Sequence, residues 1–218
     1  MKNASLTLPP VFDEAFRSQF EELLLWRRDV RRFRQDPLPE GLLDKLLVCA
    51  DQAPSVGNSQ PWRFVCVESK EARAAVLKNF ETENRTALES YSDAEAGHYA
   101  QLKLAGLKEA PVHLAVFCDD KTLQGHGLGR ATMPETLAYS VVGMIQTLWL
   151  SARAHGIGLG WVSILDPARL CADLEAEEGW QFIAYLCLGY PEEEHVDPEL
   201  VRYGWQEKTD LEMRIFLK

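Results

Sequence analysis

Apolar residues recur every three to four positions in several stretches of the chain, which is the pattern of amphipathic helices. The first such stretch follows Asp13, a suitable N-cap residue, and predicts a helix that runs toward Arg28. The longest predicted helix spans Pro134 to His155 and is apolar on most faces, as a core helix or a subunit interface would be. The other predicted helices lie near residues 42–50, 70–90, 93–108 and 167–174.

Alternating or continuous apolar residues predict strands over 63–68, 112–118, 156–164 and 182–188. The run Val112–Cys118 is almost entirely apolar and therefore predicts a central strand. Three glycines within residues 119–133 predict a mobile loop. Together these elements predict a single α/β domain over 1–218, with a lead-in over 1–12 and a terminal arm over 191–218 that needs another surface, such as a second subunit.

Composition and charge narrow the class of protein. A chain of 218 residues can bury one substantial core, and a formal net charge of −10 argues against nucleic acid or an anionic membrane as a general partner. The five cysteines are widely spaced, without a C-x-x-C motif, which indicates a reducing compartment. Cysteines 49, 66, 118 and 187 lie in apolar segments and are predicted to be buried. With no apolar signal region at the N-terminus and no membrane-length apolar stretch, we expect a cytoplasmic protein.

Five arginines gather within residues 27–34, although the chain as a whole is acidic. Like charges at helical spacing repel by roughly a few tenths of a kcal/mol per pair, so we expect a compensating anion that guanidinium groups can hold in bidentate fashion. The alternative is a solvated helix end, where arginines complement the helix dipole. Asp29 lies in the middle of this cluster and should stay ionised unless burial opposes the arginines.

Two further stretches carry candidate binding groups. The loop Ala53–Trp62 presents neutral donors and acceptors beside a tryptophan, although it could also be an ordinary turn. The glycines of Gly156–Gly160 follow a helix and open a strand, which is the reverse of the dinucleotide fingerprint, so that interpretation is rejected. Such glycines can let backbone N–H groups approach a flat ligand.

Ser163 lacks the elbow pattern of hydrolases, and a serine in such a position is more often structural. The histidines do not have the spacing of metal ligands.

These three stretches suit the parts of a flavin mononucleotide, FMN: arginines for its phosphate, amides for its ring edge and backbone N–H groups for its ring face. Together they also resemble the FMN-dependent nitroreductase superfamily, in which a serine usually follows the paired basic residues, whereas this chain has Asp29. That departure resembles the flavin-fragmenting branch of the superfamily, which acts in cobalamin biosynthesis, and the similarity covers roughly residues 20–210. The stretches that carry the resemblance are 27–33, 53–62, 102–106, 149–154 and 156–163.

The resemblance implies a homodimeric α+β fold with a central mixed sheet flanked by helices, FMN at the dimer interface, and a C-terminal arm that reaches onto the partner subunit. It implies that reduced FMN is a substrate rather than a recycled cofactor. With O₂, the flavin would be cut into 5,6-dimethylbenzimidazole, the lower ligand of cobalamin, and erythrose 4-phosphate. A separate flavin reductase using NAD(P)H would supply the reduced FMN.

The resemblance also implies roles for individual residues. Asp29 and Ser163 would form the catalytic pair, in which Asp29 moves protons and Ser163 hydrogen-bonds the flavin. Arg27, Arg28 and Arg31 would hold the phosphate and the ribityl end of FMN. The other residues expected to bind FMN are Ser55, Asn58 and Gln60 at the ring edge or ribityl hydroxyls, Gly160 and Trp161 at the ring, Val30 in the arginine motif, Asn84 and Leu104 over the pocket, and Lys208 in the tail.

Two alternatives remain open at this point. A conventional NAD(P)H-dependent nitroreductase or flavin reductase would share the fold but keep its FMN bound, and Asp29 argues against it because a carboxylate is an odd neighbour for a phosphate site. A flavin-binding protein without turnover would bind FMN equally well with aspartate or serine at position 29, and would release it intact.

Overall fold

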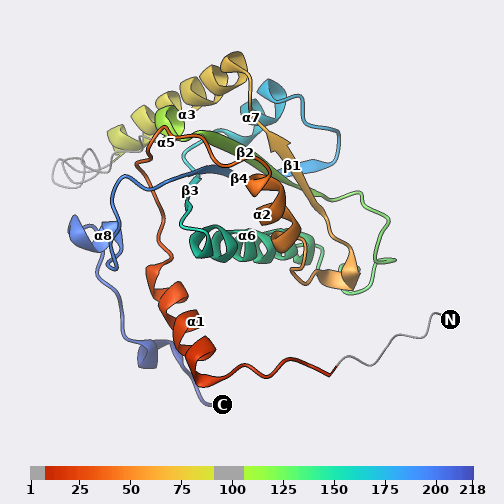
Figure 1. The fold of residues 1–218 in the computed structure, drawn as a ribbon. Coiled ribbons are helices and arrows are strands. Elements are labelled where there is room, and N and C mark those ends of the chain that lie inside the picture. The colour runs from red at the N-terminus through yellow and green to blue at the C-terminus, as the bar shows by residue number, and fades with distance from the viewer. Residues whose placement is uncertain (1–7, 91–105) are drawn as a thin grey trace.

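The computed structural model describes residues 8–90 and 106–218, and these form three layers, with a sheet between two layers of helices (Figure 1). The sheet has four strands in the order β1-β2-β4-β3. The strands are β1 (Trp62–Cys66), β2 (Val112–Asp119), β3 (Gly158–Val162) and β4 (Trp180–Gly189). As the continuous apolar run predicts, β2 is a central strand.

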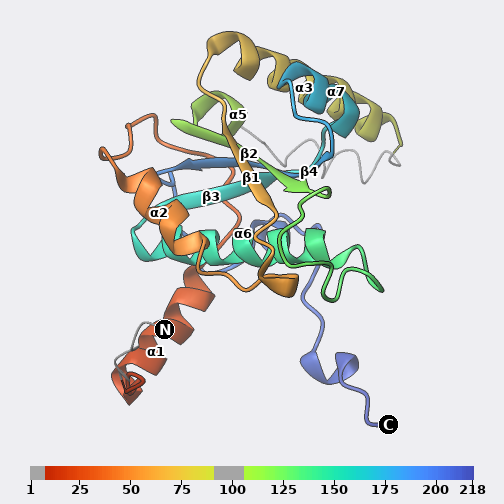
Figure 2. The same cartoon turned by 90° about the vertical axis from the view of Figure 1, so that its right-hand side faces the viewer.

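Helices cover both faces of the sheet (Figure 2). One face packs on α2 (Leu42–Ala50) and α6 (Thr136–Ala154), and the other on α3 (Lys70–Ser90), α5 (Gly106–Glu109) and α7 (Pro167–Asp173). Along β2 the buried side chains alternate between the two core clusters, so Leu114 and Val116 face α6 while Ala115 and Phe117 face α3. Burial on both faces is the reason that this strand has almost no polar position.

In the described part of the chain the sheet is antiparallel, not mixed as predicted, because β1 with β2, β2 with β4 and β3 with β4 all pair antiparallel. Continuous apolar strands are usual in parallel sheets because helical crossovers cover both faces of such sheets. Here helices cover both faces of an antiparallel sheet, so the apolar pattern carries no information about strand direction. Among the described residues, the parallel pairing is the isolated bridge between Asp29 and Leu159.

The helices follow the predicted pattern with two corrections. Asp13 caps α1 (Glu14–Trp26) as predicted, since its carboxylate accepts a hydrogen bond from the Phe16 amide at 2.9 Å. However, α1 ends at Trp26, before the arginine cluster. The longest described helix is α3, with 21 residues against 19 in α6, although α6 is the core helix that its sequence predicts. The helix predicted over 93–108 falls mostly outside the described residues, and its described end is α5.

Helix α1 and the tail after β4 extend from the same side of the body (Figures 1 and 2). No residue of α1 is buried, and the stacked rings of Phe16 and Phe20 are each more than two-fifths exposed. The tail after β4 contains α8 (Glu199–Arg202) and the 3₁₀ helix η2 (Leu211–Arg214), and η2 exposes further apolar side chains. The contact of the 191–218 arm with a second subunit is not tested by the structure of one chain, and it stays a prediction.

The cysteine prediction is half right. Cys118 and Cys187 are buried in the core, and burial raises the pKa of the Cys187 thiol to about 12, which keeps it neutral. Cys49 and Cys66 are exposed, because Cys49 lies on the outer face of α2 and Cys66 at the end of the edge strand β1. None of the helices in the described part of the chain has the length and apolar character to cross a membrane.

Candidate functional site

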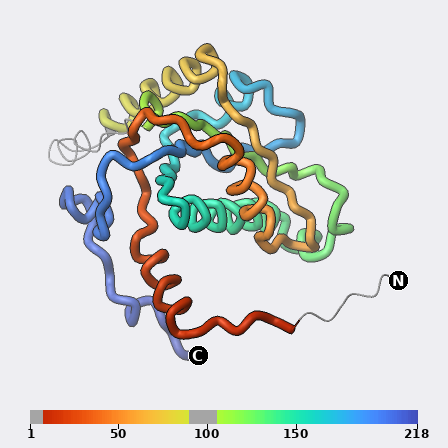
Figure 3. The backbone as a smooth tube through the Cα atoms, viewed as in Figure 1, coloured from red at the N-terminus to blue at the C-terminus, as the bar shows by residue number. Residues whose placement is uncertain are grey.

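Residues Arg27–Arg34, here called the arginine segment, are extended rather than helical and lie along the outer edge of β3. The Val30 amide donates a hydrogen bond to the Leu159 carbonyl at 3.1 Å. At the other end of the segment, the Arg34 amide donates to the Tyr190 carbonyl at 2.9 Å, and Phe33 bridges Pro191. The segment is therefore held between β3 and the chain that follows β4 (Figure 3). The helical spacing of arginines considered from the sequence does not occur.

The glycines of β3 make room for this segment. A Cβ atom at Gly160 would overlap the carbonyl oxygen of Val30, and one at Gly158 would lie 2.7 Å from a methyl carbon of Val30. Any larger residue at these positions would push the segment away from the strand. From the sequence, these glycines were expected to let backbone N–H groups approach a flat ligand. In the structure they admit the backbone and side chain of Val30.

Asp29 is held at the carboxyl end of β3 by two hydrogen bonds. Its Oδ1 accepts from the Trp161 amide at 2.9 Å, and its Oδ2 accepts from the Arg31 Nε at 3.3 Å. Burial raises the pKa of the Asp29 carboxyl, although the Trp161 amide and the Arg31 guanidinium lower it in part. The side chain keeps 37% of its surface exposed in a concave part of the surface. A carboxyl with a raised pKa and an open side is equipped to exchange protons with a bound molecule.

Arg27 and Arg28 have largely neutral partners. The Arg27 guanidinium lies over the Trp149 ring, 4.7 Å from its centroid, and Arg28 donates to the backbone carbonyls of Val196 and Arg27. Burial and the neighbouring Arg27 lower the pKa of Arg28. Asp197 opposes this effect in part, and a bound anion would further relieve the repulsion between the two arginines. Beside them is a cavity of about 170 Å³ lined by Arg27, Arg28, Asp29, Arg31, Pro198, Glu199 and Leu200.

An acidic stretch after β4, which we did not predict from the sequence, lies against the arginine segment. Arg32 lies 3.4 Å from a carboxylate oxygen of Glu193, and Arg153 forms a bidentate pair with Glu194 at 2.8 and 3.0 Å. Five acidic residues within 192–199 are the signal that could have found it, since a dense acidic run in a chain with one dense basic run predicts contact between the two.

The loop Ala53–Trp62 is ordered but lies far from the arginine segment of the same chain. The hydroxyl oxygen of Ser55 accepts from the Gln60 amide, and that of Ser140 in α6 accepts from the Val56 amide, both at 3.0 Å. The loop leads into β1, whereas the arginine segment lies beside β3, at the opposite edge of the sheet. Three strand spacings, about 14 Å in all, separate the two edges.

The remaining predicted site residues divide between the two regions. Ser163 is exposed just beyond the end of β3, two residues after Trp161, so both members of the predicted catalytic pair lie at the carboxyl end of β3. Asn84 is half-buried on α3, Lys208 is exposed in the tail, and Leu104 lies outside the described residues. Within residues 8–90 and 106–218, no group of three or more His, Cys, Asp or Glu side chains could hold a metal ion.

Comparison with known proteins gives close relatives along nearly the whole chain. It is 55% identical over 199 residues to the 5,6-dimethylbenzimidazole synthase of Rhodospirillum rubrum, covering 91% of this chain and 94% of that protein. It is 48% identical over 201 residues to the 5,6-dimethylbenzimidazole synthase of Rhodobacter capsulatus, covering 92% of this chain and 97% of that protein.

Solved structures of more distant proteins share the fold. An iodotyrosine deiodinase bound to FMN and 3-iodo-L-tyrosine is similar with a TM-score of 0.68 and 24% identity, covering 80% of this chain and 91% of that one. A nitroreductase family protein of Clostridium difficile gives a TM-score of 0.65 at 20% identity, covering 89% and 95%. The model of the nitroreductase family matches residues 24–190, a span that includes the arginine segment, the loop before β1 and all four strands. The chain belongs to the nitroreductase family.

Proposed function

We propose that this protein is a 5,6-dimethylbenzimidazole synthase, which fragments reduced FMN with O₂ to give 5,6-dimethylbenzimidazole and erythrose 4-phosphate. Identities of 55% and 48% over more than nine-tenths of the chain, to proteins with that activity in their names, support the assignment. The observation that carries it is Asp29, whose carboxylate is fixed beside Arg31 and the Trp161 amide within the arginine segment.

A carboxylate beside a phosphate site needs a reason, because it repels the phosphate and competes for the guanidinium groups. In a protein that only holds and recycles FMN, this repulsion would weaken FMN binding and would contribute nothing to catalysis. In a flavin-fragmenting enzyme, the Asp29 carboxyl, whose pKa is raised by burial, gives a group that can accept and release protons beside the substrate. The acid at this position therefore favours fragmentation over recycling.

The residues around Asp29 suit FMN as the substrate. Arg27, Arg28 and Arg31 line a cavity of about 170 Å³, which is room for a phosphate group rather than for a single water molecule. Reduced FMN supplies both the electrons for O₂ and the atoms of the two products. Asp29 holds or moves a proton at its carboxylate, and the exposed hydroxyl of Ser163 provides a hydrogen bond at the same end of β3.

A homodimer would complete the site. Ligand pockets usually enclose about 300–1,000 Å³, so the cavity at the arginine segment is too small for a whole FMN. The loop with Ser55, Asn58 and Gln60 lies at the far edge of the same chain's sheet and would instead be supplied by the second subunit. The exposed apolar residues of α1 and of the 191–218 arm offer surface that such a partner would bury. A separate flavin reductase using NAD(P)H would supply the reduced FMN.

The test is to incubate the protein with FMN, NADPH, a flavin reductase and air, and to look for 5,6-dimethylbenzimidazole by chromatography. We expect product from the parent, strongly reduced product from Asp29→Asn and Ser163→Ala, and none without O₂. Asp36→Asn is the matched control, because Asp36 is an exposed carboxylate that pairs with Arg34 at 2.8 Å.

Other outcomes would point to other functions. Intact FMN with steady NADPH oxidation on a nitroaromatic acceptor, in the absence of the reductase, would identify a conventional nitroreductase. Intact FMN without turnover, bound equally by the parent and by Asp29→Asn, would identify a flavin-binding protein. Product formation that survives both substitutions would keep the function but remove the roles assigned to Asp29 and Ser163.

A further inference from the structure

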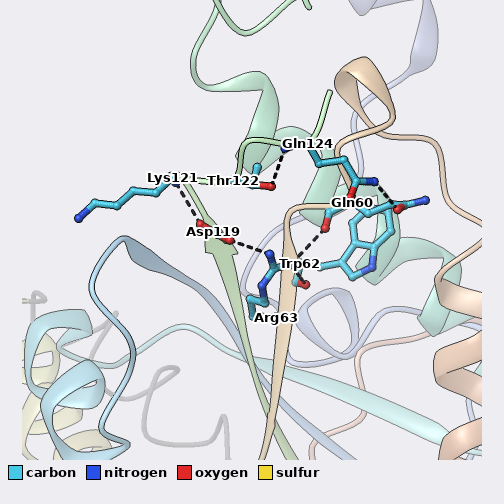
Figure 4. Close-up of polar contacts among 7 residues, drawn as sticks. All are labelled: Gln60, Trp62, Arg63, Asp119, Lys121, Thr122 and Gln124. Carbon is cyan, nitrogen blue, oxygen red and sulfur yellow. Dashed lines mark hydrogen bonds and ion pairs between the residues drawn. The ribbon is translucent and has the colours of Figure 1, made fainter. Parts of the chain in front are cut away.

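The loop Ala53–Trp62 is clamped by a second loop, residues 119–129, that comes from the end of β2. Gly57 and Gly125 bring the two backbones together, since a Cβ atom on either would lie within 3 Å of the carbonyl oxygen of the other. At the base of both loops, the Arg63 guanidinium pairs with the Asp119 carboxylate at 2.6 Å (Figure 4). From the second loop, the Gln124 side chain extends to Gln60 (Figure 4).

The hydrogen bonds of Gln124 set the orientation of every side-chain amide in this contact. Its Nε2 lies 2.9 Å from the backbone carbonyl oxygen of Asn58, which can only accept, so this atom must be the donor. The atom of Gln60 that lies 2.8 Å from the same Nε2 must then be the acceptor, Oε1. With Oε1 fixed, the Gln60 Nε2 faces the Asn58 Oδ1 at 3.4 Å. One backbone carbonyl thus fixes three amides in sequence.

The consequence is a polarity that suits a flavin. With their oxygens engaged in this contact, Gln60 and Asn58 each keep amide N–H groups for a ligand. The pyrimidine edge of a flavin carries two carbonyl oxygens, which accept from such donors. Without Gln124, either amide could rotate and present its oxygen instead, which would repel those carbonyl groups.

The backbone of the loop also needs support. Asn58 and Gln60 have φ values of 55° and 44°, in the left-handed region that residues other than glycine rarely adopt. Such conformations persist only where surrounding contacts determine them, and they gather at ligand sites. Gln124 contacts both residues, the backbone of one and the side chain of the other.

We infer that Gln124 is a positioning residue for flavin binding, which acts by fixing the orientation of the Gln60 amide. The inference rests on the proposed function, because it takes the Ala53–Trp62 loop as part of the FMN site. Gln124 itself need not touch the flavin. It lies in the glycine-rich 119–133 stretch, which the sequence predicts as a mobile loop and to which it assigns no role.

The test is a double-mutant cycle with the FMN dissociation constant as its readout, measured by quenching of flavin fluorescence. Gln124→Met keeps the length of the side chain and removes its amide, and we expect about fivefold weaker FMN binding, the factor that corresponds to one net hydrogen bond. In a Gln60→Ala background the same substitution should have no effect, because the amide that it orients is gone. Lys121→Met, an exposed position on the same loop, is the matched control and should leave binding unchanged.

Each outcome decides the point. A weaker affinity that persists in the Gln60→Ala background would overturn the inference, since Gln124 would then act on the loop as a whole. Unchanged affinity for Gln124→Met would overturn it as well. Hydrogen exchange of residues 56–60 in the flavin-free protein gives a second readout, and we expect equal exchange in Gln124→Met and the parent, because the substitution frees the Gln60 amide and leaves the loop backbone in place. If the parent binds FMN but forms no 5,6-dimethylbenzimidazole, only the proposed function is overturned. If product forms but Gln124→Met has the same effect with and without Gln60→Ala, only this inference is overturned.

Discussion

Replacing Gly160 with alanine tests whether β3 is built to receive the arginine segment. The added Cβ would overlap the Val30 carbonyl oxygen, which belongs to backbone and cannot turn aside as a flexible side chain could. The segment must therefore move away from β3. Two contacts are then at risk, the bond from the Val30 amide to Leu159 and the bond from the Trp161 amide to Asp29.

The expected loss follows from those two contacts. A neutral hydrogen bond contributes about 1 kcal/mol and one to a charged group about 1.5–3 kcal/mol, so Gly160→Ala should cost about 3 kcal/mol. For a chain of this size, 1 kcal/mol corresponds to about 2–4 °C, which gives a melting temperature roughly 6–12 °C lower. Because the Asp29 and arginine positions shift together, FMN binding should weaken by at least about tenfold, which corresponds to 1.4 kcal/mol.

Gly143→Ala is the matched control, because the chemical change is identical and no atom lies within 4 Å of the added Cβ in α6. Alanine in an open helix position should stabilise by about 0.5–1 kcal/mol. The assay is thermal unfolding followed by circular dichroism, without flavin and at one fixed protein concentration, since flavin and oligomerisation both shift the transition. Equal melting temperatures for Gly160→Ala and the parent would refute the close packing of the arginine segment on β3.

Three further predictions concern single side chains. Because burial raises the pKa of Asp29 above 3.8, its ionisation should reduce the free energy of unfolding as the pH rises through and above that value, and urea titrations between about pH 4 and pH 8 should find this loss absent in Asp29→Asn. Burial lowers the pKa of His113 from 6.5 to about 4, so stability should fall by about 3 kcal/mol as the pH drops through that range, and the same titrations on His113→Met should find the fall much reduced. Phe33→Ala removes a ring that is only 3% exposed and should cost about 3–5 kcal/mol, measured by the urea midpoint, whereas Phe12→Ala on the exposed surface should be close to neutral.

Local patterns in the sequence were sufficient for the elements whose signals are local. The Asp13 cap, the helix α7 after Asp166 and the strand β2 all lie where the sequence predicts them, because caps and apolar runs act over a few residues. The loop before β1 was likewise evident from its prolines and glycine. Its left-handed residues and its contact with Gln124 were not, since that partner is more than sixty positions away.

The arginine segment was mispredicted because its conformation is set from outside. Arg27 and Arg31 are four residues apart, as are Arg28 and Arg32, and at this spacing each pair would share one face of a helix. The extended conformation instead depends on Gly160, which leaves room for Val30, and on the residues that follow β4. No signal within residues 27–34 records either contact. The same applies to strand direction, which the apolar pattern of β2 could not indicate once helices covered both faces of the sheet.

The acidic stretch after β4 explains how a chain with a net charge of −10 can keep a selective anion site. Glu193 occupies Arg32 and Glu194 occupies Arg153, so these two cations are already paired. Arg27 and Arg28 keep ring and carbonyl partners, which leave their charge available to an incoming anion. The acids around them repel anions larger than the open patch, such as a nucleic acid backbone. A single phosphate is small enough for the cavity that Arg27 and Arg28 line, where it meets the carboxylates of Asp29 and Glu199, and Asp29 is the one that belongs to the arginine segment.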